Sequence, residues 1–281
     1  MALTDDLKDY ITRNCTNTTV IKEKHNVAIV AETHALLKTP GSEIRTKATV
    51  RLLLELLADV KYKYFANESY SQKGPIRAGV DEYMKSKTLP PVFDPKQTDL
   101  DVEEVGKRVL VRRYLPVLDF IRANPRYILD IGTIIDGEAR DAALAQNFAD
   151  EFKQRGLHAG DAGVLLLGAH HAAAVSDSKK PTVRMILEKG GFSCVSIRSL
   201  TDFQKPGEAA DDVVVETTKP LDALKQDDLI RLTSLVDKTP VTIATNRDWT
   251  DKRASPFRRV TFGSSKVSVA EQFEYIVLQK A

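Results

Sequence analysis

The stretch GVLLLGAHHA, at residues 163–172, decides the fold that we expect of the whole chain. Its first part is an uninterrupted apolar run between Gly163 and Gly168, and it is the most apolar strand candidate in the sequence. Such a run is typical of a strand that is buried on both faces, as in a parallel sheet covered by helices. Two histidines, His170 and His171, follow the run at once.

A second stretch, VAIVAETHA at residues 27–35, has the same form: an apolar run, a small residue and then a histidine, His34. Apolar residues next recur at helical spacing over residues 44–60, and a β-prone run, KYKYFAN, follows at residues 61–67. Strand, helix and strand in this order form a βαβ unit, which makes a parallel pair with a right-handed crossover.

The same alternation continues along the chain. Further strands are expected at 127–131, 163–168, 192–197, 213–215, 241–244 and 275–278, and further helices at 103–122, with Pro116 as a possible kink, at 137–155 and at 181–189. Residues 71–110 hold four prolines and one short helix, 78–86, before residue 103, so we expect an excursion or lid there. The prediction is one α/β domain over residues 1–281: a largely parallel central sheet flanked by helices, a helical or irregular insertion at 71–110, and a mixed C-terminal part with some antiparallel edge strands.

Composition narrows the classes of partner. The formal net charge is +2 and no basic run stands out, which disfavours nucleic acid and anionic membranes. Two cysteines, Cys15 and Cys194, have neither disulfide-framework nor metal-type spacing. Residues 1–14 lack the pattern of a signal peptide, and no run approaches the roughly 18 apolar residues of a membrane span. We therefore expect a cytoplasmic protein that acts on a small molecule, and the sequence predicts no oligomeric state.

Several common catalytic motifs are absent from the sequence. The phosphate loop, the dinucleotide-binding G-x-G-x-x-G, the nucleophile elbow G-x-S-x-G and the zinc-protease H-E-x-x-H do not occur. Nucleotide hydrolysis, dinucleotide redox chemistry, α/β-hydrolase chemistry and zincin proteolysis thus have no support from the sequence.

Ionisable side chains follow three of the predicted strands. Glu32 and His34 end the first strand, Glu68 follows the second, and His170 and His171 follow the apolar run. Ligands of open parallel sheets bind at the carboxyl ends of the strands, where these residues are expected to meet. A single histidine after a strand is more often an ordinary loop residue, but three of the five histidines at equivalent strand ends favour a functional site.

Arg140 and Asp141 begin the helix expected at 137–155. The helix dipole favours the aspartate there and disfavours the arginine, which hints that Arg140 is retained for another purpose. An exposed pair on the helix surface is the simpler explanation of the same two residues.

Four motifs in this order resemble the superfamily of erythromycin esterase-like proteins, which includes the TraB/Tiki proteins and the ChaN-type haem-binding proteins. The motifs are A-E-T-H (31–34), the glutamate Glu68, R-D-A-A-L-A-Q-N (140–147) and G-A-H-H (168–171), and the closing VAEQFEYIVL (269–278) is similar to the final strand of that family. Ala31 stands where the family has glycine, and Leu144 where the esterases have methionine. Neither departure removes a chemical group, but both leave the subfamily, and so the substrate, open.

The resemblance implies a cleft in which five catalytic residues converge: Glu32, His34, Glu68, Arg140 and His171. In this hypothesis His34 is the general base, a neighbouring glutamate orients it, and Arg140 with His171 stabilises an oxyanion. The reaction would be hydrolysis of a small ester or lactone, or a related hydroxyl-activating cyclisation or elimination, without a cofactor. Residues expected to contact the substrate are His170, Asp141, Arg45 and Tyr70.

Two alternatives remain open at this stage. His34, His171 and Glu68 could instead bind Mn, Co or Zn in a hydrolase or protease of TraB/Tiki type. A non-catalytic haem- or small-molecule-binding protein of ChaN type is the other, with Tyr70 or Tyr114 as axial ligand. The metal-free hypothesis is preferred because a bound dication would oppose the charge of Arg140.

Overall fold

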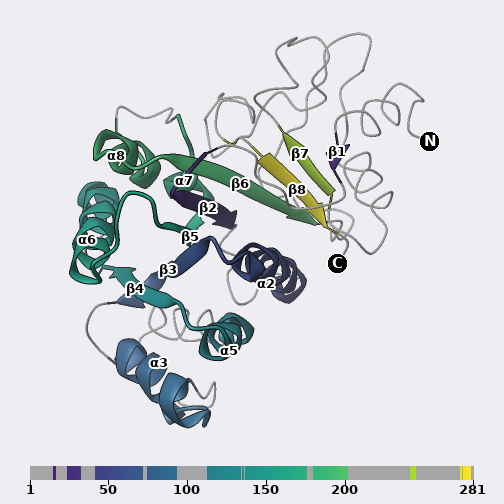
Figure 1. The fold of residues 1–281 in the computed structure, drawn as a ribbon, viewed down its shortest axis with the longest axis vertical. Coiled ribbons are helices and arrows are strands. Elements are labelled where there is room, and N and C mark those ends of the chain that lie inside the picture. The colour runs from purple at the N-terminus through teal and green to yellow at the C-terminus, as the bar shows by residue number, and fades with distance from the viewer. Residues whose placement is uncertain are drawn as a thin grey trace, which may run out of the picture.

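A computed structural model of the chain describes residues 15–16, 24–32, 42–71, 75–93, 113–133, 135, 137–175, 180–201, 241–244, 273 and 275–279. Within these residues the protein is an α/β fold built on one eight-stranded sheet, in the order β1-β7-β8-β6-β2-β5-β3-β4 (Figure 1). The strands are β1 (Cys15–Thr16), β2 (Val27–Glu32), β3 (Tyr62–Ser71), β4 (Tyr127–Gly132), β5 (Ala162–Gly168), β6 (Cys194–Thr201), β7 (Val241–Ala244) and β8 (Tyr275–Gln279).

The sheet is parallel from β8 to β4, and only its other edge is antiparallel. Neighbouring strands pair in parallel across β8, β6, β2, β5, β3 and β4. β7 runs antiparallel to β8, and β1 antiparallel to β7. The predicted parallel sheet with a mixed C-terminal part is thereby confirmed for the described strands, while the strand expected at 213–215 lies outside the described residues.

Helices cover both faces of the parallel region. They are α2 (Ser42–Ala58), α3 (Pro75–Ser86), α5 (Leu115–Ala123), α6 (Arg140–Gln154), the single turn α7 (Ala169–Ala172) and α8 (Val183–Lys189), with 3-10 turns η1 (Pro91–Phe93) and η2 (Gly137–Ala139). In Figure 1, α2 and α5 lie on one face of the sheet, and α6 and α8 lie on the other. α2, α6 and α8 lie between the strands where sequence periodicity placed them, so the alternation of strands and helices is confirmed there.

The two faces of the sheet have different cores. Towards α2 and α5 the core is mainly aliphatic, with Val30, Leu53, Leu57, Leu118 and Val164 completely buried or nearly so. Towards α6 and α8 it is aromatic: Tyr64 and Phe192 each pack edge-on against the rings of Phe148 and Phe152. The strand residues alternate between these two cores, because successive side chains of a strand point to opposite faces.

Gly163 lies where an aromatic ring crosses the sheet. A Cβ atom at this position would overlap the ring of Tyr64. At the other end of the sheet a Cβ on Gly132 would lie 2.7 Å from the carbonyl of Tyr70. Both positions therefore require glycine for close packing.

Asn26 ties together the amino ends of the central strands. Its side-chain Oδ1 accepts the backbone N–H of Ser193 (2.8 Å), before β6, and its Nδ2 donates to the carbonyl of Ala159 (3.3 Å), before β5. Its own carbonyl accepts from the hydroxyl of Tyr64 (2.7 Å) and from the N–H of Gly163 (3.0 Å). One buried amide thus links four strands.

The region of the expected insertion differs from the prediction in one respect. The helix expected over 103–122 is interrupted, because Tyr114 lies in a turn and α5 starts at Leu115. Pro116 occupies the first turn of α5, where its missing N–H has no helical partner to lose. Residues 94–112 lie outside the described part of the chain. Of the helices that the structure describes, none combines the length and the apolarity that crossing a membrane requires.

Candidate active site

The candidate site lies at the carboxyl end of β5. The connections that follow β5 and its neighbouring strands lead to opposite faces of the sheet there. β5 lies between β2 and β3. The chain leaves β2 and β3 towards the face of α2 and α5, but leaves β5 for α7 and then α8 on the other face (Figure 1). Connections that part in this way open a crevice above the strand ends, and ligands of α/β sheets bind in such crevices.

Glu68 fixes the end of β5 from the neighbouring strand. Its carboxylate Oε1 accepts the backbone N–H of Gly168 at 3.0 Å, and only 7% of the residue is exposed. The sequence separates these two residues by a hundred positions, yet the parallel pairing of β3 with β5 brings them together. Glu68 therefore lies beside the end of β5, next to the turn that carries His171, although its own strand β3 continues to Ser71.

His171 lies between two carboxylates. Its Nδ1 is 2.5 Å from Oδ1 of Asp141, and its Nε2 is 3.9 Å from Oε2 of Glu68. The first distance is that of a close ion pair, although the two groups are not aligned as a hydrogen bond. The side chain of His171 is 19% exposed, so part of it remains accessible.

The single turn α7 is anchored by its last carbonyls. Ser196 donates its hydroxyl to the carbonyl of Ala172 (2.5 Å), and Thr182 donates to the carbonyl of Ala173 (2.7 Å). Successive residues of a helix point about 100° apart, so His170 and His171 cannot face the same way. His170 is exposed, and His171 alone turns towards Asp141 and Glu68.

Glu32 ends β2 beside the same turn. It pairs with Gly168 across the β2–β5 ladder and is 8% exposed. Its Oε2 accepts a hydrogen bond from the hydroxyl of Tyr114, at the start of α5. Tyr114 is itself buried, so its hydroxyl orients Glu32 and is not open to an external ligand.

Arg140 is the first residue of α6, next to Asp141. Its Nε is buried and has no hydrogen-bond acceptor among the described residues, and no described carboxylate lies at ion-pair distance from its guanidinium. Asn147, about two turns further along α6, donates to the carbonyls of Ile131 (3.1 Å) and Gly132 (3.2 Å) and so fixes α6 to the end of β4. The amino end of α6 is thus held firmly above the strand ends.

The structure describes only some of the remaining predicted residues. His34 and the side chain of Arg45 lie outside the described residues, so their convergence on the site stays a prediction. Tyr70 is fully buried, packs edge-on against Phe65, and has its pKa raised by burial and by the nearby Asp130 carboxylate. In the part of the chain that the structure describes, no three His, Cys, Asp or Glu side chains form a group that could hold a metal ion.

Two contacts were not foreseen from the sequence: Asp141 with His171, and Tyr114 with Glu32. The aspartate was expected at the substrate, and the tyrosine only as a haem ligand. The one available signal for Asp141 was its place beside Arg140 at a helix start, which points it towards the strand ends. No pattern in the sequence could indicate which side chain Tyr114 meets.

Comparisons with known proteins add two distant similarities of structure. The chain is similar to a mutant of the erythromycin esterase EreC in its open conformation, at 12% identity over 90% of each chain, with a TM-score of 0.44. It is also similar to the type III effector HopBA1, at 13% identity over 62% of this chain and 77% of that one, with a TM-score of 0.33. No protein-family model matches the sequence, and neither does a curated protein.

Proposed function

We propose that this protein is a hydrolase-like enzyme in which His171 is the general base that activates water against a small organic ester or lactone. The observation that carries the proposal is the place of the partly exposed His171 side chain between the carboxylates of Asp141 and Glu68. A carboxylate beside one ring nitrogen fixes the tautomer and stabilises the imidazolium, which leaves the other nitrogen to take a proton. This assigns to His171 the role that the sequence suggested for His34.

The reaction would proceed in two steps. Nε2 of His171 takes a proton from water while the oxygen attacks the carbonyl carbon, and the negative charge that forms on the carbonyl oxygen is stabilised by Arg140. The carbon–oxygen bond of the ester then breaks as the imidazolium returns the proton to the leaving alcohol. The same groups would serve a cyclisation or elimination in which a substrate hydroxyl takes the place of water.

Arg140 suits the role of oxyanion donor because the Nε of its guanidinium has no acceptor in the part of the chain that the structure describes. A buried polar atom without a partner is rare in a folded protein and needs an explanation. The Nε of Arg140 is such an atom among the described residues. A substrate oxygen at this point would satisfy it, which supports a ligand position between α6 and α7.

The decisive experiment compares two histidines at opposite ends of the molecule. His171→Ala should lower kcat on a panel of p-nitrophenyl esters and lactones by about 10²–10⁴-fold, the usual contribution of a general base. His158→Ala removes an exposed histidine before β5 and should leave kcat within about threefold. His170→Ala should raise KM more than it lowers kcat, if the exposed ring contacts the substrate. Equal rates for His171→Ala and His158→Ala would refute the proposal.

Two further measurements separate the alternatives. Dialysis against EDTA should leave the rate unchanged, whereas a loss restored by Mn, Co or Zn would identify a metal enzyme instead. An absorbance scan of the protein mixed with haem tests the ChaN-type alternative, and a Soret shift abolished by Tyr70→Phe or Tyr114→Phe would support it.

A further inference from the structure

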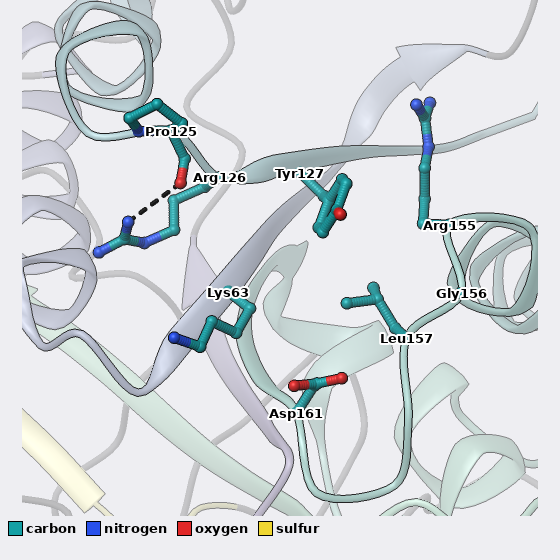
Figure 2. Close-up of a pocket in the computed structure, with 8 residues that line it drawn as sticks. All are labelled: Lys63, Pro125, Arg126, Tyr127, Arg155, Gly156, Leu157 and Asp161. Carbon is teal, nitrogen blue, oxygen red and sulfur yellow. Dashed lines mark hydrogen bonds between the residues drawn. The ribbon is translucent and has the colours of Figure 1, made fainter.

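A pocket of about 460 Å³ lies at the opposite end of the sheet from His171. Lys63 near the start of β3, Tyr127 at the start of β4 and Asp161 just before β5 contribute to its wall, together with Arg126, Arg155 and Leu157 (Figure 2). Its volume is within the range of small-molecule sites, about 300–1,000 Å³. The seven-residue strand β5 separates it from the candidate active site, which is about 20 Å at the rise of a strand.

The charge of this pocket is unbalanced. Three cationic side chains surround it and one carboxylate, Asp161, opposes them. Arg155 is already paired with Glu151 at 3.3 Å. Lys63 and Arg126 have no carboxylate partner at ion-pair distance among the described residues. With the opposing charge of Asp161 counted, one positive charge of the pocket remains uncompensated.

Arg126 has only neutral hydrogen-bond acceptors among the described residues. Its Nη1 donates to the carbonyls of Pro125 (3.1 Å) and Asn124 (3.4 Å), which are neutral acceptors. Its Nε is buried and has no acceptor among the described residues. Burying a guanidinium nitrogen without an acceptor is costly, and an anion would remove that cost.

The other side of the pocket is apolar. Tyr127 is 48% exposed, unusually much for the first residue of a strand that is buried further along, and Leu157 lies beside it. In Figure 2 the Tyr127 ring and Leu157 lie on one side of the pocket, and the charged ends of Lys63 and Arg126 lie on the other. An aromatic face opposite two cations suits a ligand with a flat ring at one end and negative charge at the other.

We propose that this pocket binds an aromatic anion, a compound with a planar ring and a phosphate or carboxylate group. The ring would pack against Tyr127 and Leu157, and the anionic group would accept hydrogen bonds from Lys63 and Arg126. This site is independent of the proposed catalysis, because it shares no residue with the carboxyl end of the sheet.

Titration calorimetry on the full chain tests this with phenyl phosphate and benzoate as probes and phenol as the uncharged counterpart. Both anions should bind, phenol should bind at least tenfold more weakly, and the affinity for the anions should fall as salt is added. Tighter binding of phenyl phosphate than of benzoate would identify an organic phosphate as the preferred ligand, and the reverse an aromatic carboxylate.

Charge variants locate the binding. Lys63→Gln, at an exposed position where misfolding is not expected, should weaken phenyl phosphate binding about tenfold. Arg126→Gln should weaken it at least as much, and Asp161→Asn, which keeps the acceptor for the N–H of His158, should strengthen it. The control Lys189→Gln, an exposed lysine at the end of α8, should bind as the wild type does.

Three results would overturn the proposal: no heat with either anion, equal binding of phenol and phenyl phosphate, or equal affinities of Lys63→Gln and Lys189→Gln. Binding by His171→Ala should equal that of the wild type, so this test does not depend on whether the protein is an esterase.

Discussion

The two ends of the parallel sheet differ in how far their charged side chains are buried. At the carboxyl end, Glu32 and Glu68 are buried and each accepts a specific hydrogen bond. At the amino end, Lys63 and Arg155 are exposed and the strands are joined by neutral groups around Asn26. Charges act strongly on one another where water is excluded and weakly where it is not. One end is therefore suited to moving protons, and the other to holding the fold and attracting an anion.

The largest expected effect comes from removing the charge beside His171. Asp141→Asn should lower kcat by about 100-fold or more, because the amide neither fixes the tautomer nor stabilises the imidazolium. Stability should change by only about 0.5–1 kcal/mol, the worth of an acidic residue in the first turn of a helix.

A rate for Asp141→Asn within threefold of the wild type would contradict the assignment of proton transfer to the carboxyl end of the sheet. Asp150→Asn, on the exposed side of the same helix, is the matched control and should not alter the rate.

The second test uses Asp130, a buried carboxylate in the middle of β4. Burial raises the pKa of Asp130 to about 6 from 3.8, although the Arg77 guanidinium opposes the shift. Between these values the folded chain keeps a proton that the unfolded chain has lost, so the free energy of unfolding falls as pH rises from about 4 to 6. This contribution amounts to at most about 3 kcal/mol and is constant above pH 6.

Asp130→Asn cannot ionise, so this fall should be missing from its stability curve. Urea denaturation of both proteins between pH 4 and 7.5 measures the difference, which cancels the carboxylates that the two share. Parallel curves would show that Arg77 compensates fully for burial and that Asp130 titrates as an exposed aspartate does.

The smallest effect concerns the amino end. Asn26→Ala removes the hydrogen bonds to Ser193 and Ala159 and should destabilise the protein by about 2 kcal/mol, since each buried bond contributes about 1 kcal/mol. At a temperature where the variant is folded, its kcat should equal that of the wild type. A selective loss of kcat without loss of stability would mean that the two ends are not independent.

The elements of the fold could be predicted because burial leaves a strong mark on sequence. The runs that became β2 and β5 are apolar at nearly every position, and helices such as α6 have one apolar stripe. Pro116 was harder to interpret, since proline is equally consistent with a kink and with a helix start. Only the structure shows that α5 starts at Leu115 and that Pro116 lies in its first turn.

The sequence indicated the edge of the sheet at which the candidate site lies, but not which side chains contact each other there. Polar residues after buried strands indicate which rim holds the chemistry, and Glu32, Glu68 and His171 do lie on one rim. The contacts between carboxylates and histidine rings depend on the order of the strands across the sheet. This order cannot be inferred from the hydrophobic periodicity of each segment. Asp141 was therefore assigned to the substrate, although it lies against His171.

The pairing of β2 also constrains how the chain can be synthesised. Val27 pairs in register with Gly163 of β5 on one side and with Cys194 of β6 on the other, so neither partner strand exists until more than half of the chain has been synthesised. Until then this apolar strand has two open edges, a condition that slows folding and favours aggregation. Because His171 lies in α7, directly after β5, the proposed catalytic base comes to lie beside Glu68 of β3 only when this late strand inserts between β2 and β3.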